Sequence, residues 1–191
     1  MLTKTQVRAI LDKMEVIQDG HFVLRGGRHA SQGVFPMRVL QAPEYAQNLA
    51  LTLATAYRTQ RPQVVLVGPG AGALLGLQLA RAFAARVVLC ENEDGRWTVS
   101  PGQALNPGER VVICEDVVTD AAELRGRAEL IQSWGAEFVG VTTLFDLTEG
   151  AEFPWPLEAL VRPEIAALHP AHCPQCATGT PLSAPATFVM V

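Results

Sequence analysis

The sequence predicts a single α/β domain with a mostly parallel central sheet. Short apolar runs rich in β-branched side chains recur along the chain, which is typical of buried parallel strands. Segments with helical spacing follow several of these runs, and one run leads directly into a glycine-rich turn and a helix. The 191 residues are 49% hydrophobic and 18% charged. This size and composition are sufficient for one folded domain with a substantial core.

The first half of the chain alternates helical and extended patterns. Thr3 or Thr5 is suited to cap the first helix, and a proline is suited to the first turn of the second. The expected elements are a helix over 3–18 ended by Asp19-Gly20, a strand over 21–29 broken by a glycine pair, a helix over 43–58, a strand over 63–67 and a helix over 73–84.

The second half continues the alternation around a central strand, Val111 to Cys114. Asn106-Pro107-Gly108 supplies a turn before this strand. The other expected elements are a strand over 86–90, a hairpin arm over 97–99 with its turn at Ser100-Pro101-Gly102, a helix over 120–134 capped by Gly135, a strand over 138–145 and an edge strand over 157–161.

Two acids, Glu115 and Asp116, directly follow the central strand. Open α/β sheets bind ligands at the carboxyl ends of their strands. A carboxylate pair at such a place is costly unless water, a metal or hydroxyl groups satisfy it. The pair therefore marks a candidate binding site, and the alternative is an ordinary strand end with surface acids.

A glycine-rich turn, 68–72, lies between the strand over 63–67 and its helix. Small residues at such a turn let an oxyanion approach the backbone N–H groups and the helix N-terminus. The turn precedes the acidic strand end by one β-α unit, so both are expected at the same edge of the sheet. This arrangement predicts an anion-binding loop beside the carboxylate pair.

Charge and hydropathy exclude several classes of protein. The formal net charge is −4, and no block of lysine or arginine is present, which argues against a nucleic-acid surface. The first residues lack the apolar core of a secretory signal, and no apolar run reaches the ~20 residues of a spanning helix. We therefore expect a cytoplasmic protein without membrane partners.

The tail carries a Cys-x-x-Cys turn formed by Cys173 and Cys176, with His169 and His172 nearby. Zinc prefers four sulfur or nitrogen ligands, so this cysteine pair forms a partial zinc site. Structural or incidental cysteines are the favoured interpretation, and zinc is the alternative. Redox chemistry has less support, because no strand-to-helix context surrounds the pair. Cys90 and Cys114 are expected to be buried small hydrophobes.

Several motifs together resemble one enzyme family. Residues 115–119, Glu-Asp-Val-Val-Thr, resemble the phosphoribosyl-pyrophosphate (PRPP) motif of type I phosphoribosyltransferases. The Gly-His-Phe opening at 20–22, the helix from Pro43, the Asn-Pro-Gly entry and the Cys-Pro-x-Cys tail resemble orotate phosphoribosyltransferases in the same order. The resemblance implies a Rossmann-like three-layer fold, with helices on both faces of the sheet and a small N-terminal hood. It places the hood at about 1–40 together with the tail, and the core at about 41–165.

The resemblance also implies a reaction and its site. The family joins orotate to PRPP, giving orotidine 5′-monophosphate and pyrophosphate in pyrimidine biosynthesis, and uses Mg²⁺ and a homodimer. By this resemblance Glu115 and Asp116 hold the ribose hydroxyls, and Arg96 belongs to a lid. The pyrophosphate loop comprises Gly68, Gly70, Ala71 and Gly72, and the 5′-phosphate loop comprises Thr119, Asp120, Ala121, Ala122 and Glu123. No residue is assigned as catalytic.

Three parts of the expected site depart from the family pattern. The usual Thr-Thr-Gly-x-Ser loop becomes Thr119 to Glu123, with two carboxylates where phosphate should bind. The region from 91 to 106 offers only Arg96 against three acids, where the family lid is cationic. Leu147 stands where the family has an arginine that contacts orotate. Three hypotheses follow: a family enzyme with altered activity, a non-catalytic paralogue that binds a nucleotide-like ligand or a protein, or a transferase for another base.

Overall fold

A six-stranded sheet forms the centre of the protein in the computed structural model, which describes residues 1–24, 27–119, 121–148 and 154–183. The strand order is β5-β4-β3-β6-β7-β8, and all neighbours are parallel except β4 and β5. The strands are β3 (Val64–Val67), β4 (Arg86–Glu93), β5 (Arg96–Val99), β6 (Arg110–Val118), β7 (Glu137–Asp146) and β8 (Leu157–Val161). The predicted mostly parallel sheet is confirmed.

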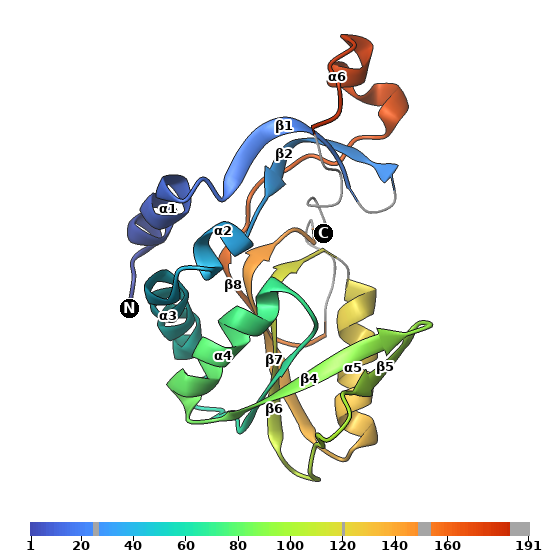
Figure 1. Ribbon diagram of the computed structural model, residues 1–191. Coiled ribbons are helices and arrows are strands. Elements are labelled where there is room, and N and C mark those ends of the chain that lie inside the picture. The colour runs from blue at the N-terminus through green and yellow to red at the C-terminus, as the bar shows by residue number, and fades with distance from the viewer. Residues whose placement is uncertain (25–26, 120, 149–153, 184–191) are drawn as a thin grey trace.

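Helices cover both faces of this sheet (Figure 1). The longer ones are α3 (Pro43–Leu53), α4 (Ala71–Phe83) and α5 (Ala121–Ser133), and the short α2 (Met37–Leu40) and η2 (Ala54–Tyr57) flank α3. Successive side chains of a strand point to opposite faces. Accordingly, Val65 and Val67 pack in the core under α3 and α4, whereas Val64 and Leu66 pack in the core under α5. The three-layer prediction is confirmed.

A separate two-stranded antiparallel sheet, β1 (Ile17–Val23) and β2 (His29–Val34), lies beyond the carboxyl edge of the main sheet (Figure 1). Helix α1 (Lys4–Lys13) precedes it. The predicted helix over 3–18 was therefore too long. Glu15 adopts a left-handed conformation with φ of 49°, which ends the helix, and Val16 is fully buried as the chain turns into β1.

Strands β4 and β5 form a hairpin whose turn is Asp94-Gly95. Both turn residues have positive φ, 50° and 83°, and Glu93 pairs with Arg96 across them. Such two-residue turns match the twist of a hairpin, and Asp-Gly is a favoured sequence for them. The predicted turn at Ser100-Pro101-Gly102 was wrong, because those residues follow β5 and lead away from the hairpin.

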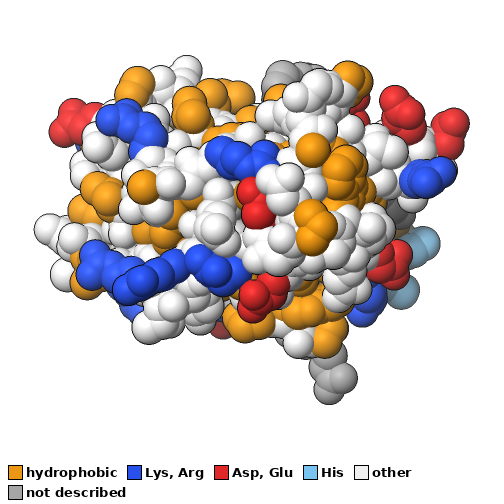
Figure 2. Space-filling view, turned by 90° about the horizontal axis from the view of Figure 1, so that it is seen from below, with side chains coloured by type: hydrophobic (Ala, Val, Ile, Leu, Met, Phe, Trp, Pro, Cys, Tyr) orange, Lys and Arg blue, Asp and Glu red, His pale blue; other side chains and the backbone are white. Residues whose placement is uncertain are grey.

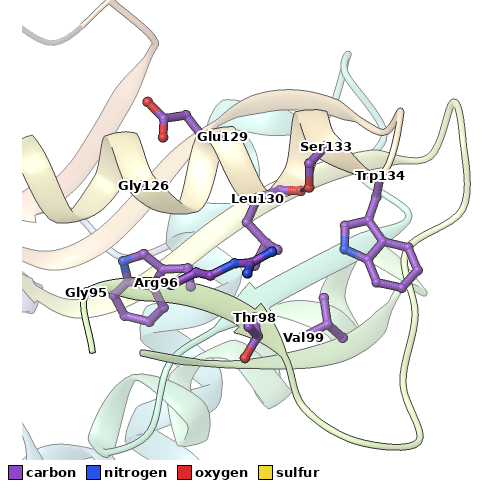
Figure 3. A pocket seen from close by; sticks show the side chains of 10 residues that line it. Gly95, Arg96, Thr98, Val99, Gly126, Glu129, Leu130, Ser133 and Trp134 are labelled. Carbon is purple, nitrogen blue, oxygen red and sulfur yellow. Dashed lines mark hydrogen bonds between the residues drawn. The ribbon is translucent and has the colours of Figure 1, made fainter. Parts of the chain in front are cut away.

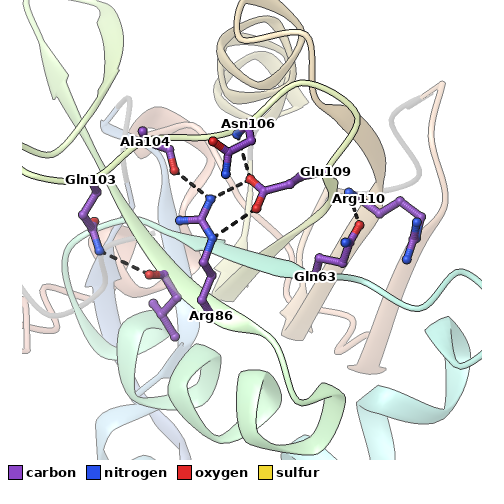
Figure 4. Close-up of polar contacts among 8 residues, drawn as sticks. Gln63, Arg86, Gln103, Ala104, Asn106, Glu109 and Arg110 are labelled. Carbon is purple, nitrogen blue, oxygen red and sulfur yellow. Dashed lines mark hydrogen bonds and ion pairs between the residues drawn. The ribbon is translucent and has the colours of Figure 1, made fainter.

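The amino edge of the sheet is held by polar contacts around Arg86 (Figure 4). Its Nη2 donates to Glu109 Oε2 at 2.6 Å and to Ala104 O at 2.8 Å. Burial alone would raise the pKa of Glu109, but hydrogen bonds from Arg86 and Asn106 leave this pKa lowered. Seen from this end in Figure 2, Lys and Arg side chains form a row on part of the surface. This edge lies opposite the predicted binding site.

The tail returns to the hairpin of β1 and β2. Leu168 forms an antiparallel bridge with His29, and the short η3 (Pro170–His172) and α6 (Pro174–Ala177) follow. The predicted boundaries of hood and core stay a prediction.

Among the described residues, no helix is long and apolar enough to cross a bilayer.

Candidate functional site

The carboxyl edge of the main sheet brings two of the predicted loops together. Val67, the last residue of β3, pairs with Cys114 of β6, so the glycine turn after β3 lies beside the acids of β6. β6 continues to Val118, and the acids therefore lie within its last part rather than after it. The predicted ribose-binding and pyrophosphate-binding residues thus share one edge.

Gly72 lies close to Asp116. A Cβ atom on Gly72 would lie 3.2 Å from the backbone nitrogen of Asp116 and 3.3 Å from its Oδ1. This spacing is tighter than an ordinary side-chain contact, so a glycine suits the position. Gly70 has φ of 116°, a conformation that side chains rarely adopt, and it immediately precedes α4. The turn therefore presents backbone N–H groups and a helix N-terminus to the acids.

Asp116 is partly buried, and burial raises the pKa of its carboxyl group. Backbone N–H groups of Asp116, Val117 and Gly72 donate toward the carboxylate and oppose this rise. The net effect is still upward, because desolvation outweighs these hydrogen bonds. Asp116 is thus a carboxylate whose ionised form is costly in the free protein and would gain from hydroxyl or cation partners.

Glu115 forms an ion pair with Arg127, a residue that the sequence analysis did not identify. The side chains are 14% and 6% exposed, respectively. The guanidinium carbon of Arg127 lies 4.1 Å from the ring centre of Trp97, and burial lowers the pKa of Arg127. Arg127 follows Leu124 by three residues on α5. The helical spacing of Leu124, Ala128 and Ile131 could therefore have predicted that Arg127 faces the sheet.

The predicted 5′-phosphate loop is described only in part. Thr119 follows β6 and is partly buried, and α5 begins two positions later at Ala121. Asp120 lies outside the described residues, and so do the side chains of Ala121 and Glu123. Ala122 is exposed. The described backbone thus places Thr119 beside the N-terminus of a long helix, a position compatible with an anion.

The carboxyl end of β7 carries Asp146 and Leu147. Leu147 packs against the core under α3 and α4, and its N–H donates to Val118 O at 2.8 Å. Arg162, just after β8, donates from Nε to Asp146 Oδ2 at 2.9 Å. Asp146 and Arg162 line a pocket of about 620 Å³ with Leu147 and residues 163–166. An arginine thus reaches this strand end from β8 instead of from position 147.

Arg96, the predicted lid cation, is the exposed first residue of the otherwise half-buried β5 strand (Figure 3). It lines a pocket of about 510 Å³ between β5 and α5, together with Gly126, Glu129 and Trp134 among others. Residues 91–99 are organised as the β4–β5 hairpin in this structure. The assignment of Arg96 to a lid stays a prediction.

The tail cysteines meet two histidines from the hairpin. His21, His29, Cys173 and Cys176 place one ligand atom each within 4.8 Å of one another. The histidines near the pair in sequence, His169 and His172, are not members of this group. Zinc at the cysteine pair stays a prediction. His21 and His29 lie about 150 positions away, on β1 and β2, and only the fold brings them to the tail.

The other two cysteines are buried in the main sheet, as predicted. Burial raises the pKa of Cys90 to about 11 and raises that of Cys114 further, with a contribution from Asp116 in the latter case. Both thiols are therefore protonated at neutral pH and pack as small hydrophobes.

Comparison with known proteins identifies the relatives of this chain. It is 34% identical to orotate phosphoribosyltransferase of Caldanaerobacter subterraneus subsp. tengcongensis over 186 residues, which cover 96% of this chain and 97% of the relative. It is 33% identical to the enzyme of the same name from Thermotoga maritima over 181 residues, covering 94% and 96%. No family model matches the chain.

Solved structures share the fold. Orotate phosphoribosyltransferase from Aeropyrum pernix aligns with a TM-score of 0.69 at 22% identity, covering 82% of this chain and 93% of that one. UMP synthase of Leishmania donovani aligns with a TM-score of 0.69 at 19% identity, covering 98% of this chain and 41% of that one. Nothing in the described part of the molecule favours the non-catalytic hypothesis over the enzyme. By its sequence relatives and its fold, the chain belongs to the orotate phosphoribosyltransferase family.

Proposed function

We propose that this protein transfers the phosphoribosyl group of PRPP to orotate and releases pyrophosphate. The main support for this proposal is that Asp116 and the glycine turn at 68–72 adjoin at one edge of the sheet. The chain also matches orotate phosphoribosyltransferases over nearly its whole length. In this reaction the bond from the ribose C1 to the pyrophosphate oxygen breaks, and its electron pair leaves with pyrophosphate. A bond from C1 to a ring nitrogen of orotate forms in its place, and the proton of that nitrogen is released to solvent.

The residues of this edge suit the parts of PRPP. The Asp116 carboxylate accepts hydrogen bonds from the ribose hydroxyls. The Glu115 carboxylate accepts them as well, while it is held in place by its ion pair with Arg127. The backbone N–H groups at the start of α4 receive the pyrophosphate oxygens. Binding at these fixed groups orients the reacting carbon, which is the main contribution that positioning makes to such a transfer.

Mg²⁺ is the proposed cofactor. Its preferred ligands are carboxylate, phosphate and water oxygens, and Glu115 and Asp116 supply the carboxylates at this edge. The upward shift in the pKa of Asp116 fits a carboxylate that gains from a neighbouring cation. A bound Mg²⁺ would neutralise negative charge on the diphosphate.

We assign recognition of the orotate carboxylate to Arg162. Its Nε and Nη2 donate to Asp146 Oδ2 and Leu157 O, so Asp146 fixes the guanidinium at the carboxyl end of β7. An arginine offers five donors in a planar fork, and two such bonds leave donors for an anionic ring substituent. Arg162 thereby replaces the arginine that position 147 lacks.

The family assembly also belongs to this proposal. We expect a homodimer and a cytoplasmic location, because both accompany the enzyme that the sequence resembles. A sedimentation measurement with and without PRPP tests the dimer.

Loss of orotate absorbance in the presence of PRPP and Mg²⁺ tests the activity, with calorimetry of PRPP binding beside it. Turnover that depends on both substrates supports the proposal. PRPP binding without turnover, or no binding at millimolar PRPP, overturns it. The double change Asp120→Thr with Glu123→Ser isolates the altered phosphate loop, and we expect it to tighten PRPP binding. A carboxylate at ~4 Å from a phosphate charge costs about 1 kcal/mol in water and about 4 kcal/mol at an effective dielectric of 20.

A further inference from the structure

We propose that His21, His29, Cys173 and Cys176 bind one zinc ion that fastens the tail of the chain to the β1–β2 hairpin. A zinc site at the cysteine pair alone would have two protein ligands, whereas the fold brings four together. Zn²⁺ favours four-coordinate sites built from cysteine sulfur and histidine nitrogen, and a Cys₂His₂ set is a common form of them. The site is separate from the sheet edge proposed for PRPP.

Four of the six distances between the ligand atoms are near those of a tetrahedral zinc site. Zinc bonds of about 2.0–2.1 Å to nitrogen and about 2.3 Å to sulfur give tetrahedral edges of roughly 3.3 to 3.8 Å. The observed distances from His21 Nε2 are 3.4 Å to Cys173 Sγ and 3.6 Å to Cys176 Sγ. From His29 Nδ1 they are 3.2 Å to Cys176 Sγ and 2.9 Å to His21 Nε2. These four distances lie within about 0.5 Å of the tetrahedral edges, and all four ligand atoms lie within 4.8 Å of one another, so small side-chain movements would bring them to the spacing that the ion requires.

A hydrogen bond fixes the correct form of His21. Its Nδ1 lies 2.8 Å from Thr180 O. A carbonyl oxygen only accepts, so Nδ1 carries the proton and Nε2 presents its lone pair to the cluster. Metal-binding histidines almost always donate their other ring nitrogen in this way, which sets the tautomer and orients the ring. The acceptor belongs to the tail, so the contact also joins the two parts of the site.

Further hydrogen bonds hold the tail against the hairpin around the cluster. Gln175 Nε2 donates to Gly20 O at 2.9 Å. The His21 backbone N–H donates to Ser183 Oγ at 2.9 Å, and the Ser183 N–H donates to His21 O at 2.7 Å. His21, His29 and Cys173 are buried, and Cys176 is exposed. All four coordination positions are filled by protein atoms, which is typical of structural rather than catalytic zinc.

Metal analysis of the purified full-length protein tests this proposal. We expect about one zinc per chain in wild type and near zero in Cys176→Ser and His29→Ala. The double variant His169→Ala with His172→Ala is the matched control, because both residues adjoin the cysteines in sequence but lie outside the cluster. It should keep its zinc. Cobalt exchanged into wild type should give the intense thiolate charge-transfer bands of a tetrahedral site.

Folding of the variants is checked by circular dichroism, so that metal loss is read only from folded protein. If a variant fails to fold, cobalt titration of zinc-stripped wild type decides the question by itself. Wild type that takes up neither zinc nor cobalt would overturn the proposal. Detection of a Cys173–Cys176 disulfide by mass spectrometry would also overturn it. Equal zinc content in the control variant and in the cluster variants would do the same.

Discussion

Arg127 forms a buried ion pair with Glu115, one of the two acids expected to hold the ribose of PRPP. The partner comes from α5, and the Trp97 ring covers its guanidinium. The sheet edge thus contains its own cation next to the glycine turn, where a Cβ on Gly68 would lie 3.5 Å from Arg127 Nη2. Glu115 is fixed in place before any substrate arrives.

Replacing Arg127 with methionine should destabilise the protein. Breaking a buried ion pair leaves one charge without compensation and costs about 3–5 kcal/mol. Urea unfolding of Arg127→Met, Glu115→Gln and the double variant measures the coupling between them. We expect the double variant to lose less than the sum of the single variants. Additive losses would show that the two side chains do not depend on each other.

Asp116→Asn should stabilise the free protein while it weakens PRPP binding. Burial raises the pKa of Asp116, so the folded protein holds this proton more tightly than the unfolded chain does. Ionisation of Asp116 therefore lowers the stability of the folded protein. This loss of stability is absent at a pH well below the ordinary carboxyl pKa and reaches its full value above the raised pKa of the folded state. The variant should therefore unfold at a higher temperature than wild type at pH 7.

This advantage should vanish as the pH falls well below about 4, where both the folded and the unfolded wild type carry the proton. Loss of one charge-assisted hydrogen bond, at about 1.5–3 kcal/mol, should weaken PRPP binding by roughly 10- to 100-fold. Thermal unfolding at several pH values and calorimetry measure the two effects. A variant that is less stable than wild type at pH 7 would contradict the assigned cause of the shift.

Arg162→Met should raise the KM for orotate by roughly 10- to 100-fold, the cost of one lost charge-assisted hydrogen bond. The KM for PRPP should change little, because Arg162 lies at the end of β8 rather than at the glycine turn. Steady-state kinetics with each substrate varied in turn gives both constants. Arg8→Met is the control, since Arg8 is 85% exposed on α1. Equal changes in both constants would argue against a role in orotate recognition.

Tyr57→Phe should destabilise the fold by about 1–3 kcal/mol, because the buried carbonyl group of Val141 loses its donor. The Tyr57 hydroxyl donates to Val141 O at 2.7 Å and lies 3.0 Å from Pro156 O, and burial raises its pKa. It thereby ties η2 to β7 and to the segment that enters β8. Tyr45→Phe removes only a contact with exposed Lys13 and should cost much less. Chemical denaturation compares the two variants.

Local patterns were sufficient to predict the sheet and its flanking helices. Val64 to Val67 form a short apolar run before a glycine turn, and this pattern has one simple interpretation in an α/β chain. The same reasoning placed Glu115 and Asp116 beside the turn, because parallel strands share a carboxyl edge. The Asp94-Gly95 turn was equally available from sequence, since the dipeptide itself favours a two-residue hairpin.

Contacts between distant segments could not be predicted in this way. Periodicity shows that Arg127 faces the sheet, but it does not identify Glu115 as the partner. It likewise cannot join His21 and His29 to cysteines about 150 positions later. Such pairs depend on how whole elements pack, and a single sequence carries no local sign of them. The sequence therefore predicted the juxtaposition of the glycine turn and the acids, which follows from the shared carboxyl edge of parallel strands, but not the contacts that cross the fold.

The contacts between the hairpin and the tail have a consequence for the order of folding during synthesis. β1 and β2 leave the ribosome early, whereas Cys173, Cys176 and Thr180 emerge after all six strands of the main sheet. The sheet and its helices can assemble while translation continues. In the hairpin, by contrast, the imidazoles of His21 and His29 contact each other but lack their partners from the tail until the tail has been synthesised. The final packing of the hairpin is therefore a late step in folding.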